Sequence, residues 1–351
     1  MKLTSLNSLI PRREARKAVA GVPPVEAIEQ EAIAKAYRSA YPLEQSPNPK
    51  KWVKSLGKFS RPHTIIGTSL SVLALYLISL ATTDTNLNLV NLEQMMAVWF
   101  ACLGGNIYIV GLNQLYDLEI DRVNKPELPL ASGEFTVGQG KLIIVVAGCL
   151  SIVIAGLSGI WLFATIIISL IIGTAYSVPP IRLKRFPFWA AFCILTVRGV
   201  VVNIGLFLHY GDQLNGRDVL NPYVWTLTLF ILLFTVAIAI FKDVPDIEGD
   251  KQYKIKTFTL VMGKPAVFNL SRGVITVCYF GMIAAGLFWL TALNVSFFVT
   301  SHLILLGLLW WRSLDVDLEQ KSAIADFYQF IWKLFFAEYL LFSLACLMSV
   351  G

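Results

Sequence analysis

The stretch AVWFACLGGNIYIVGLNQLYDLEIDRVNKP, residues 97–126, joins an apolar segment directly to a run of polar and acidic residues. Its first half has the composition of a bilayer-spanning helix. Its second half places Asn113, Asp117 and Asp121 four residues apart, a spacing that puts side chains on one face of a helix. The stretch therefore predicts a membrane helix that ends in a cluster of polar side chains, a pattern typical of a functional site.

The rest of the chain is equally apolar. Of its 351 residues 56% are apolar, and the mean hydropathy is +0.65, which is too high for a soluble domain of this length. We therefore expect an all-α, multi-pass membrane protein with about nine transmembrane helices around a central cavity. The expected spans are residues 64–82, 94–114, 139–157, 159–176, 188–209, 222–241, 267–286, 290–311 and 325–348.

The distribution of Lys and Arg predicts an orientation. Basic residues concentrate in alternate segments between the spans, whereas the intervening loops hold only Arg217. Because cytoplasmic loops are enriched in basic residues, we expect the N-terminus on the cytoplasmic side and the C-terminus on the opposite side. The net charge of +6 is then a membrane-surface charge, and we expect the lipid bilayer, not nucleic acid, as a partner.

The N-terminal segment, residues 1–57, differs from the rest in being polar and proline-bearing. We expect it to be a largely disordered arm that precedes a transmembrane domain over residues 58–351. A cleaved targeting segment is the alternative, but such segments are poor in acids, and this arm holds several glutamates, including Glu26, Glu29 and Glu31. The sequence favours a retained arm.

A second acidic motif, KDVPDIEGD at residues 242–250, follows the sixth expected span. It contains Asp243, Asp246 and Asp250, and Pro245 interrupts its helical pattern. Four spans separate the two acidic motifs, so the topology places both at the same face of the membrane. Two functionally unrelated acidic loops would have no reason to lie at the same membrane face.

Crowded carboxylates at helix C-termini are unfavourable unless cations join them, because a helix C-terminus is already partly negative. Mg²⁺ takes carboxylate oxygens together with substrate phosphates. A substrate with a diphosphate head and an apolar tail would fit an acidic mouth over a hydrophobic interior, and an allylic prenyl diphosphate has both parts. The simpler alternative is two solvated loops that balance nearby lysines, and the repeated spacing argues against it.

Several cations lie where they could assist such a site. Arg182 and Lys184, just after the Pro-Pro pair of YSVPPIRLKR, are expected to bind diphosphate oxygens, whereas Arg185 is better understood as an ordinary basic loop residue. Arg198 lies ten residues into the fifth expected span, so it is expected to face the cavity and not lipid. Asn203 is expected either to line the same interior or to make an interhelical hydrogen bond.

Residues 113–126 and 242–250 together resemble the two Asp-rich motifs of the UbiA superfamily of intramembrane aromatic prenyltransferases, with Gln114 where that superfamily often has Asp. The likeness runs from about Phe59 to the last span. It is greatest to the branch that prenylates homogentisate in tocopherol synthesis, on TAYSVPPIRLKRF, ILTVRGVVVNIGLFL and FKDVPDIEGDKQYKIKTFTL. The resemblance implies the UbiA-type fold and a photosynthetic-type membrane, cyanobacterial or plastid.

The resemblance also implies the reaction. A phytyl group would pass from phytyl diphosphate to homogentisate with decarboxylation, giving 2-methyl-6-phytyl-1,4-benzoquinol. Mg²⁺ would be the cofactor, and Lys242 would contact phosphate. The implied ligands of one metal ion are Asn113, Asp117 and Asp121, and those of the other are Asp243, Asp246 and Asp250. The residues expected to be essential for turnover are Asp117, Asp121, Asp246 and Asp250.

The acceptor's carboxylate needs a cationic partner in an apolar cavity. Arg198 is the first candidate and Arg61, at the start of the first span, is the second. Alternative functions are a geranylgeranyl or solanesyl transfer to homogentisate, a chlorophyll-synthase-like transfer to another acceptor, and a transporter. A transporter should carry its ionisable residues near the bilayer midplane, whereas these acids lie at helix ends. The sequence favours no particular oligomeric state.

Overall fold

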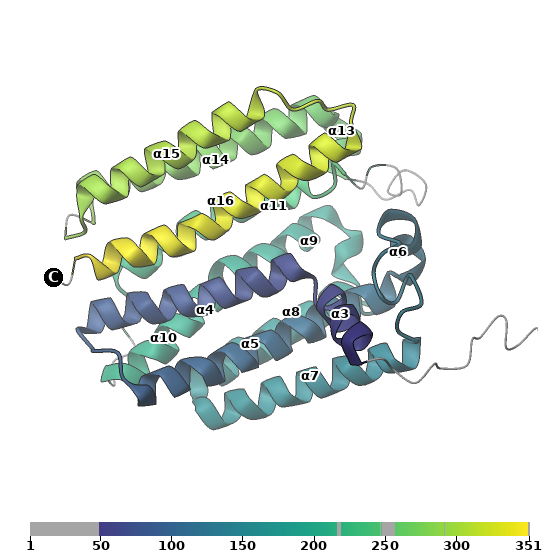
Figure 1. Ribbon diagram of the computed structural model, residues 1–351, viewed down its shortest axis with the longest axis horizontal. Coiled ribbons are helices and arrows are strands. Elements are labelled where there is room, and N and C mark those ends of the chain that lie inside the picture. Colours follow the sequence, from purple (N-terminus) through teal and green to yellow (C-terminus); the bar gives the residue numbers. More distant parts are fainter. Residues whose placement is uncertain (1–48, 216–218, 246, 248–256, 291, 350–351) are drawn as a thin grey trace, which may run out of the picture. The chain divides into compact units, whose positions relative to one another are not determined.

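The computed structural model describes residues 49–215, 219–245, 247, 257–290 and 292–349. The chain divides into two units, residues 1–54 and residues 55–351, and the second unit holds the helix bundle (Figure 1). Within the described ranges there is no strand. Nine helical segments of these ranges are long and apolar enough to cross a membrane, which confirms the expected all-α membrane fold.

The long helices occupy most of the second unit. Their bounds are α4 (Pro62–Thr83), α5 (Leu89–Tyr116), α7 (Val137–Ser158), α8 (Ile160–Ser177), α11 (Pro222–Phe241), α14 (Lys264–Phe288), α15 (Val295–Ser313) and α16 (Lys321–Leu347). One further span is built from α9 (Pro187–Ile194), a π-helical segment (Leu195–Val201) and α10 (Val202–Asn215). The short helices are α3 (Pro49–Phe59), α6 (Leu118–Asn124), η1 (Leu183–Arg185) and α13 (Phe258–Met262).

The expected spans match these helices, with differences at the ends. α5 begins at Leu89 and not at 94, because Asn88 and Asn91 form a capping box that admits a polar first turn. The expected start of the eighth span at 290 is wrong, since α15 begins only at Val295. There the Asn294 side chain accepts a hydrogen bond from the backbone N–H of Phe297, which fixes the N-terminus of the helix.

Small residues allow α5 and α7 to approach closely. A Cβ atom at Gly104 would lie 2.8 Å from the Ala147 carbonyl oxygen and 3.1 Å from Cβ of Ser151. The Ser151 hydroxyl, in turn, donates a hydrogen bond of 2.6 Å to the carbonyl of Ala101. Contacts between small residues, with a hydroxyl bonding to the neighbouring backbone, are a usual means of holding membrane helices together.

A cavity of about 240 Å³ lies between helices that are far apart in the sequence. It is lined by residues of α4, α5, α8, the span from α9 to α10, and α16, so the expected central cavity is present. Its wall is mostly apolar, with a few polar side chains from α4, α5 and α8 and the charged side chain of Arg198. The short helix α6, which follows α5, and α13, which precedes α14, lie at the same end of the bundle (Figure 1).

Candidate active site

The polar cluster begins where α5 ends. The sequence predicts one continuous helical face through Asn113, Asp117 and Asp121, but the helix breaks at Asp117, where φ is −111° and ψ is 13°. The backbone N–H of Asp117 still bonds to the carbonyl of Asn113 at 3.0 Å, and that of Asp121 bonds to the carbonyl of Asp117 at 2.8 Å. The four-residue spacing is therefore kept while the chain turns into α6.

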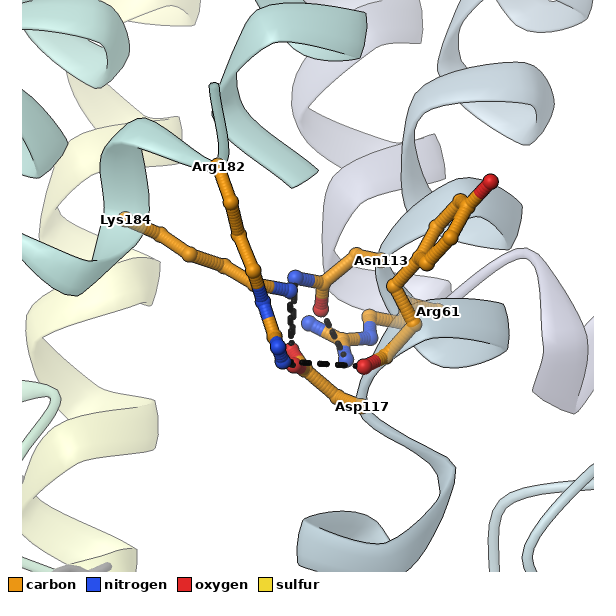
Figure 2. Close-up of polar contacts among 6 residues, drawn as sticks. Arg61, Asn113, Asp117, Arg182 and Lys184 are labelled. Carbon is orange, nitrogen blue, oxygen red and sulfur yellow. Dashed lines mark hydrogen bonds and ion pairs between the residues drawn. The ribbon is translucent and has the colours of Figure 1, made fainter. Parts of the chain in front are cut away.

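The carboxylate of Asp117 is the centre of the cluster. It accepts hydrogen bonds from Arg182 at 3.0 Å and from Lys184 at 2.6 Å, and the Asn113 amide donates to it at 3.0 Å (Figure 2). Arg182 and Lys184 come from the loop between α8 and α9. The structure thus brings together four of the predicted site residues from two distant parts of the chain.

Arg61 joins the same cluster from the start of α4. Its guanidinium donates to the side-chain oxygen of Asn113 at 2.9 Å (Figure 2). Both arginines of the cluster have left-handed backbone conformations, with φ of 53° at Arg61 and 38° at Arg182. This conformation is costly for residues other than glycine, and it is concentrated at functional sites.

Asp121 has a different environment. It is buried, with 5% of its surface exposed, and its Oδ2 atom has no hydrogen-bond partner among the described residues. Burial raises the pKa of its carboxyl to about 6, against the lowering effect of Arg61. Burial also lowers the pKa of Lys184, against the raising effect of Asp117. A buried carboxylate with an unpartnered oxygen is suited to a bound cation.

Gln114 occupies the position at which the UbiA superfamily often has Asp, and its side chain makes a structural contact instead. Its side chain is 1% exposed and points away from the cluster, donating a hydrogen bond of 2.6 Å to the carbonyl oxygen of Phe59. Phe59 precedes the turn that carries Arg61. The Gln114 amide therefore fixes the backbone just before α4 and does not point toward the predicted metal ligands Asn113 and Asp117.

The second acidic motif is described only in part. Asp243 follows α11 and lies 3.8 Å from the Nζ atom of Lys242, whereas Asp246 and Asp250 lie outside the described residues. Within the described ranges, no group of three or more His, Cys, Asp or Glu side chains is placed to hold a metal ion.

Arg198 lies in the cavity wall, as predicted, on the π-helical segment. Its guanidinium carbon is 4.7 Å from the ring centroid of Trp332 and 5.9 Å from that of Phe335. Of the acids that the structure describes, none forms a salt bridge with Arg198. The guanidinium is thus held by aromatic faces and retains its donors for an anion.

Asn203 makes an interhelical hydrogen bond, one of its two expected roles, and does not line the cavity. It is fully buried, donates to the carbonyl of Gly199 at 2.8 Å, and accepts from the Tyr339 hydroxyl at 2.9 Å. The first bond ties the Asn203 amide to the backbone of the π-helical segment, and the second ties it to α16. Asn203 therefore fixes the segment that carries Arg198.

The sequence interpretation missed the aromatic wall of α16. Trp332, Phe335 and Tyr339 all line the cavity, and their spacing of three and four residues places them on one helical face. That spacing was visible in the sequence. It does not distinguish a cavity wall from ordinary core packing, since α16 also buries Phe327 and Phe342.

Comparison with known proteins identifies the fold and the relatives. Residues 69–334 match the UbiA prenyltransferase family. The chain is 57% identical over 294 residues to homogentisate phytyltransferase of Synechocystis sp., covering 84% of this chain and 96% of that protein. It is 39% identical to homogentisate phytyltransferase 1 of Arabidopsis thaliana, covering 95% and 83%, and 35% identical to homogentisate geranylgeranyltransferase of Triticum aestivum, covering 85% and 74%.

Solved structures share the fold at low identity. A UbiA homologue from Archaeoglobus fulgidus, solved with GPP and Mg²⁺, has a TM-score of 0.56 and 18% identity, covering 84% of this chain and 99% of that chain. The similarity extends over the whole helix bundle. The arrangement of the helices is therefore one that also occurs in a solved UbiA homologue.

Proposed function

The chain belongs to the UbiA prenyltransferase family, and we propose that it transfers a phytyl group from phytyl diphosphate to homogentisate, releasing diphosphate and carbon dioxide. The observation that carries this proposal is the continuity of the polar cluster with the apolar cavity. Thr64 lies one turn beyond Arg61, and Val110 lies one turn before Asn113. Both of these intervening residues line the cavity, so a diphosphate head and a prenyl tail have adjoining environments.

Arg182 and Lys184 are the proposed ligands of the diphosphate, with Lys242 as a further contact. The three cations around Asp117, which include Arg61, outnumber the carboxylates of Asp117 and Asp121, so the cluster favours an added anion. Arg61, Arg182 and Lys184 each have a hydrogen-bond partner here, and a diphosphate would exchange some of these bonds for its own. Charge-assisted bonds to phosphate oxygens are strong enough for that exchange.

The residues also fit Mg²⁺. Asn113, Asp117 and Asp121 supply oxygen ligands, and the buried, unpartnered oxygen of Asp121 is an atom that a cation would satisfy. We propose these three residues for one ion and Asp243, Asp246 and Asp250 for the other. When bound, Mg²⁺ neutralises charge on the diphosphate and makes it a better leaving group.

The chain's own residues support the bond changes. The bond between the allylic carbon and the diphosphate oxygen breaks, and the electron pair leaves with the diphosphate, whose charge Arg182 and Lys184 stabilise. The allylic cation that remains lies in a cavity with Tyr176, Trp332 and Phe335 in its wall. Aromatic faces stabilise a cation, and the apolar wall excludes water that would consume it.

Arg198 is the proposed partner of the homogentisate carboxylate. It has donors available, whereas Arg61 already donates to Asn113, so Arg198 is the better candidate of the two. The electron-rich ring attacks the allylic cation and forms a carbon–carbon bond, after which the ring carbon loses its proton. Carbon dioxide leaves from the side chain, and the methylene carbon takes up a proton to give the methyl group of 2-methyl-6-phytyl-1,4-benzoquinol.

The relatives support a proposal for the donor and for the kind of membrane. Phytyl diphosphate is the proposed donor because the Synechocystis and Arabidopsis relatives are phytyltransferases. Geranylgeranyl diphosphate is the second candidate, because the relative from Triticum aestivum is a geranylgeranyltransferase. We infer a photosynthetic membrane, cyanobacterial or plastid, with the polar cluster and the N-terminus on the cytoplasmic or stromal side.

The proposed reaction can be tested by following the carboxyl carbon. Membranes containing the expressed protein are incubated with carboxyl-labelled homogentisate, with and without phytyl diphosphate. We expect labelled carbon dioxide to be released only when the prenyl diphosphate is present, in a one-to-one ratio with prenylated quinol. Prenylated product that retains the label would show that the acceptor chemistry is different.

A further inference from the structure

Asn106 is a polar residue of the cavity wall with no part in the reaction described above. It lies on α5, seven residues before Asn113, and it lines the cavity. Its side-chain nitrogen donates to the Thr64 hydroxyl oxygen at 3.1 Å and to the Ser60 carbonyl oxygen at 3.4 Å. Both partners belong to the first turn of α4 and the segment just before it.

These bonds determine which way the amide points. The Thr64 hydroxyl is within 2.9 Å of the Ser60 carbonyl oxygen and 2.8 Å of the Arg61 carbonyl oxygen, so its single hydrogen is committed to the backbone. Thr64 can then only accept from Asn106. Because the Ser60 carbonyl also can only accept, the NH₂ group of Asn106 must face both atoms.

The carbonyl oxygen of the amide consequently faces the other way. No described residue donates to Oδ1 of Asn106, and this atom is not among the fully buried atoms that lack a partner. It is an accessible acceptor in a mostly apolar wall. An acceptor in such a place is unfavourable unless a donor meets it, and the donor has to come from whatever occupies the cavity.

Asn106 lies at the level along α5 where the reacting end of the prenyl diphosphate is expected. Asn106, Val110 and Asn113 lie on one helical face, and seven residues correspond to about 10 Å along a helix. A diphosphate held beside Asn113 would thus place its first prenyl carbons between Asn113 and Asn106. An aromatic acceptor must approach those carbons, and Arg198 lies in the wall of the same cavity.

We propose that Oδ1 of Asn106 accepts a hydrogen bond from one phenolic hydroxyl of the aromatic acceptor and so selects hydroxylated rings. The inference rests on the proposed function, because it assumes that the acceptor is a hydroxyphenylacetate such as homogentisate. Arg198 would hold the carboxylate, and Asn106 would fix the rotation of the ring about its side chain. A hydroxyl that donates to the amide also shifts electron density into the ring, which favours attack on an allylic cation.

A purely structural role for Asn106 is the competing hypothesis, since the same amide ties α5 to α4. The two roles use different atoms. The NH₂ group serves the helix contact, whereas Oδ1 serves the substrate, so the two can be separated by substitution and by choice of inhibitor. A loss of the helix contact alone would affect all acceptor analogues equally.

The test uses the full-length enzyme in membranes and measures inhibition of homogentisate prenylation. The inhibitors are phenylacetate, 2-hydroxyphenylacetate and 3-hydroxyphenylacetate, of which the last two each keep one hydroxyl of homogentisate. For the unmodified enzyme we expect one of the monohydroxylated compounds to inhibit about tenfold more strongly than phenylacetate, the usual size of one hydrogen bond. Equal inhibition by all three would overturn the proposal without any variant.

Two variants then assign the effect. Asn106→Leu should abolish the discrimination between hydroxylated and unhydroxylated inhibitors, because it removes Oδ1. Thr64→Val removes the partner of the NH₂ group but leaves Oδ1, so it should keep the discrimination. Discrimination that survives Asn106→Leu would overturn the assignment. Failure of homogentisate to react at all would instead refute the proposed function, so the two failures are distinguishable.

Discussion

Asp117 accepts hydrogen bonds from an arginine, a lysine and an asparagine, which makes it the most heavily bonded side chain of the site. We predict that Asp117→Asn lowers kcat at least about a hundredfold, because it removes a negative ligand in a site where charge stabilisation dominates. The same loss is expected for Asp121→Asn. The measurement is the rate of prenylation in membranes with matched amounts of protein.

Glu119 supplies the control for these two substitutions. It lies on α6, between Asp117 and Asp121, but it is exposed and pairs with Arg122 three residues away. Glu119→Gln should therefore keep ordinary turnover. If all three variants lose activity together, the loss reports on the folding of α6 and not on ligand chemistry.

Arg198 gives the second prediction at this scale. Arg198→Leu should raise the KM for homogentisate far more than that for the prenyl diphosphate, because only the acceptor loses its counter-charge. Loss of a charged partner for the carboxylate should weaken the binding free energy of homogentisate by about 2 to 4 kcal/mol. Steady-state kinetics with each substrate varied in turn is the measurement.

Arg198→Lys is the matched control, since it keeps a cation and should recover part of the homogentisate affinity. Thermal stability of each variant must be compared, because Arg198 also packs on Trp332. An unchanged homogentisate KM in a stable Arg198→Leu enzyme would contradict the assignment, and Arg61 would then be tested in its place.

The sequence predicted the acidic repeat at the end of α5 and the cations Arg182 and Lys184 after the Pro-Pro pair, but not the bonds that join distant residues. Asn113 and Asp117 are four residues apart, and this spacing is enough to bring their side chains into hydrogen-bond contact. The bond between Arg61 and Asn113 joins residues 52 positions apart, and no local pattern reports it. The orientation of Gln114 likewise depends on a backbone carbonyl from another helix.

At the scale of helices, the tight contact between α5 and α7 makes a prediction about stability. Gly104→Ala should destabilise the protein by about 1 to 3 kcal/mol, because its Cβ would lie 2.8 Å from a backbone oxygen. The backbone cannot move aside as a flexible side chain could. The measurement is the midpoint of thermal unfolding in detergent.

Gly281→Ala on α14 is the matched control, because a Cβ there meets nothing within 4 Å. It should leave the unfolding midpoint unchanged or raise it slightly, since alanine is the better helix former. Equal destabilisation by both substitutions would show that loss of glycine itself, and not the α5–α7 contact, is responsible.

The helices themselves were largely predictable, because an uninterrupted run of about 20 apolar residues is typical of a membrane span and rare elsewhere. Their interruptions were not. The break at Asp117 lies where the carboxylate bonds to another loop, and in the π-helical segment around Arg198 the Gly199 carbonyl is bonded to Asn203, which also bonds to Tyr339. Both irregularities depend on tertiary contacts, and both fall at the proposed site.

At the scale of the whole molecule, the N-terminal arm is predicted to be dispensable for the reaction. Deleting residues 1–48, which precede α3, should leave the kcat and both KM values in isolated membranes largely unchanged, because these residues lack the hydrophobicity to join the core. Targeting and partner contacts should be the only functions affected. A correctly inserted but inactive truncated enzyme would show that the arm contributes to the site.

The central claim is that the enzyme prenylates homogentisate with a metal-bound prenyl diphosphate in one cavity. Product analysis tests this claim most directly. Membranes containing the enzyme are incubated with homogentisate and an equimolar mixture of labelled phytyl, geranylgeranyl and solanesyl diphosphates, with Mg²⁺ or with excess chelator. The expected result is 2-methyl-6-phytyl-1,4-benzoquinol as the main product, formed only with Mg²⁺. Equal yield in chelator, or no prenylated quinol from any donor, would contradict it.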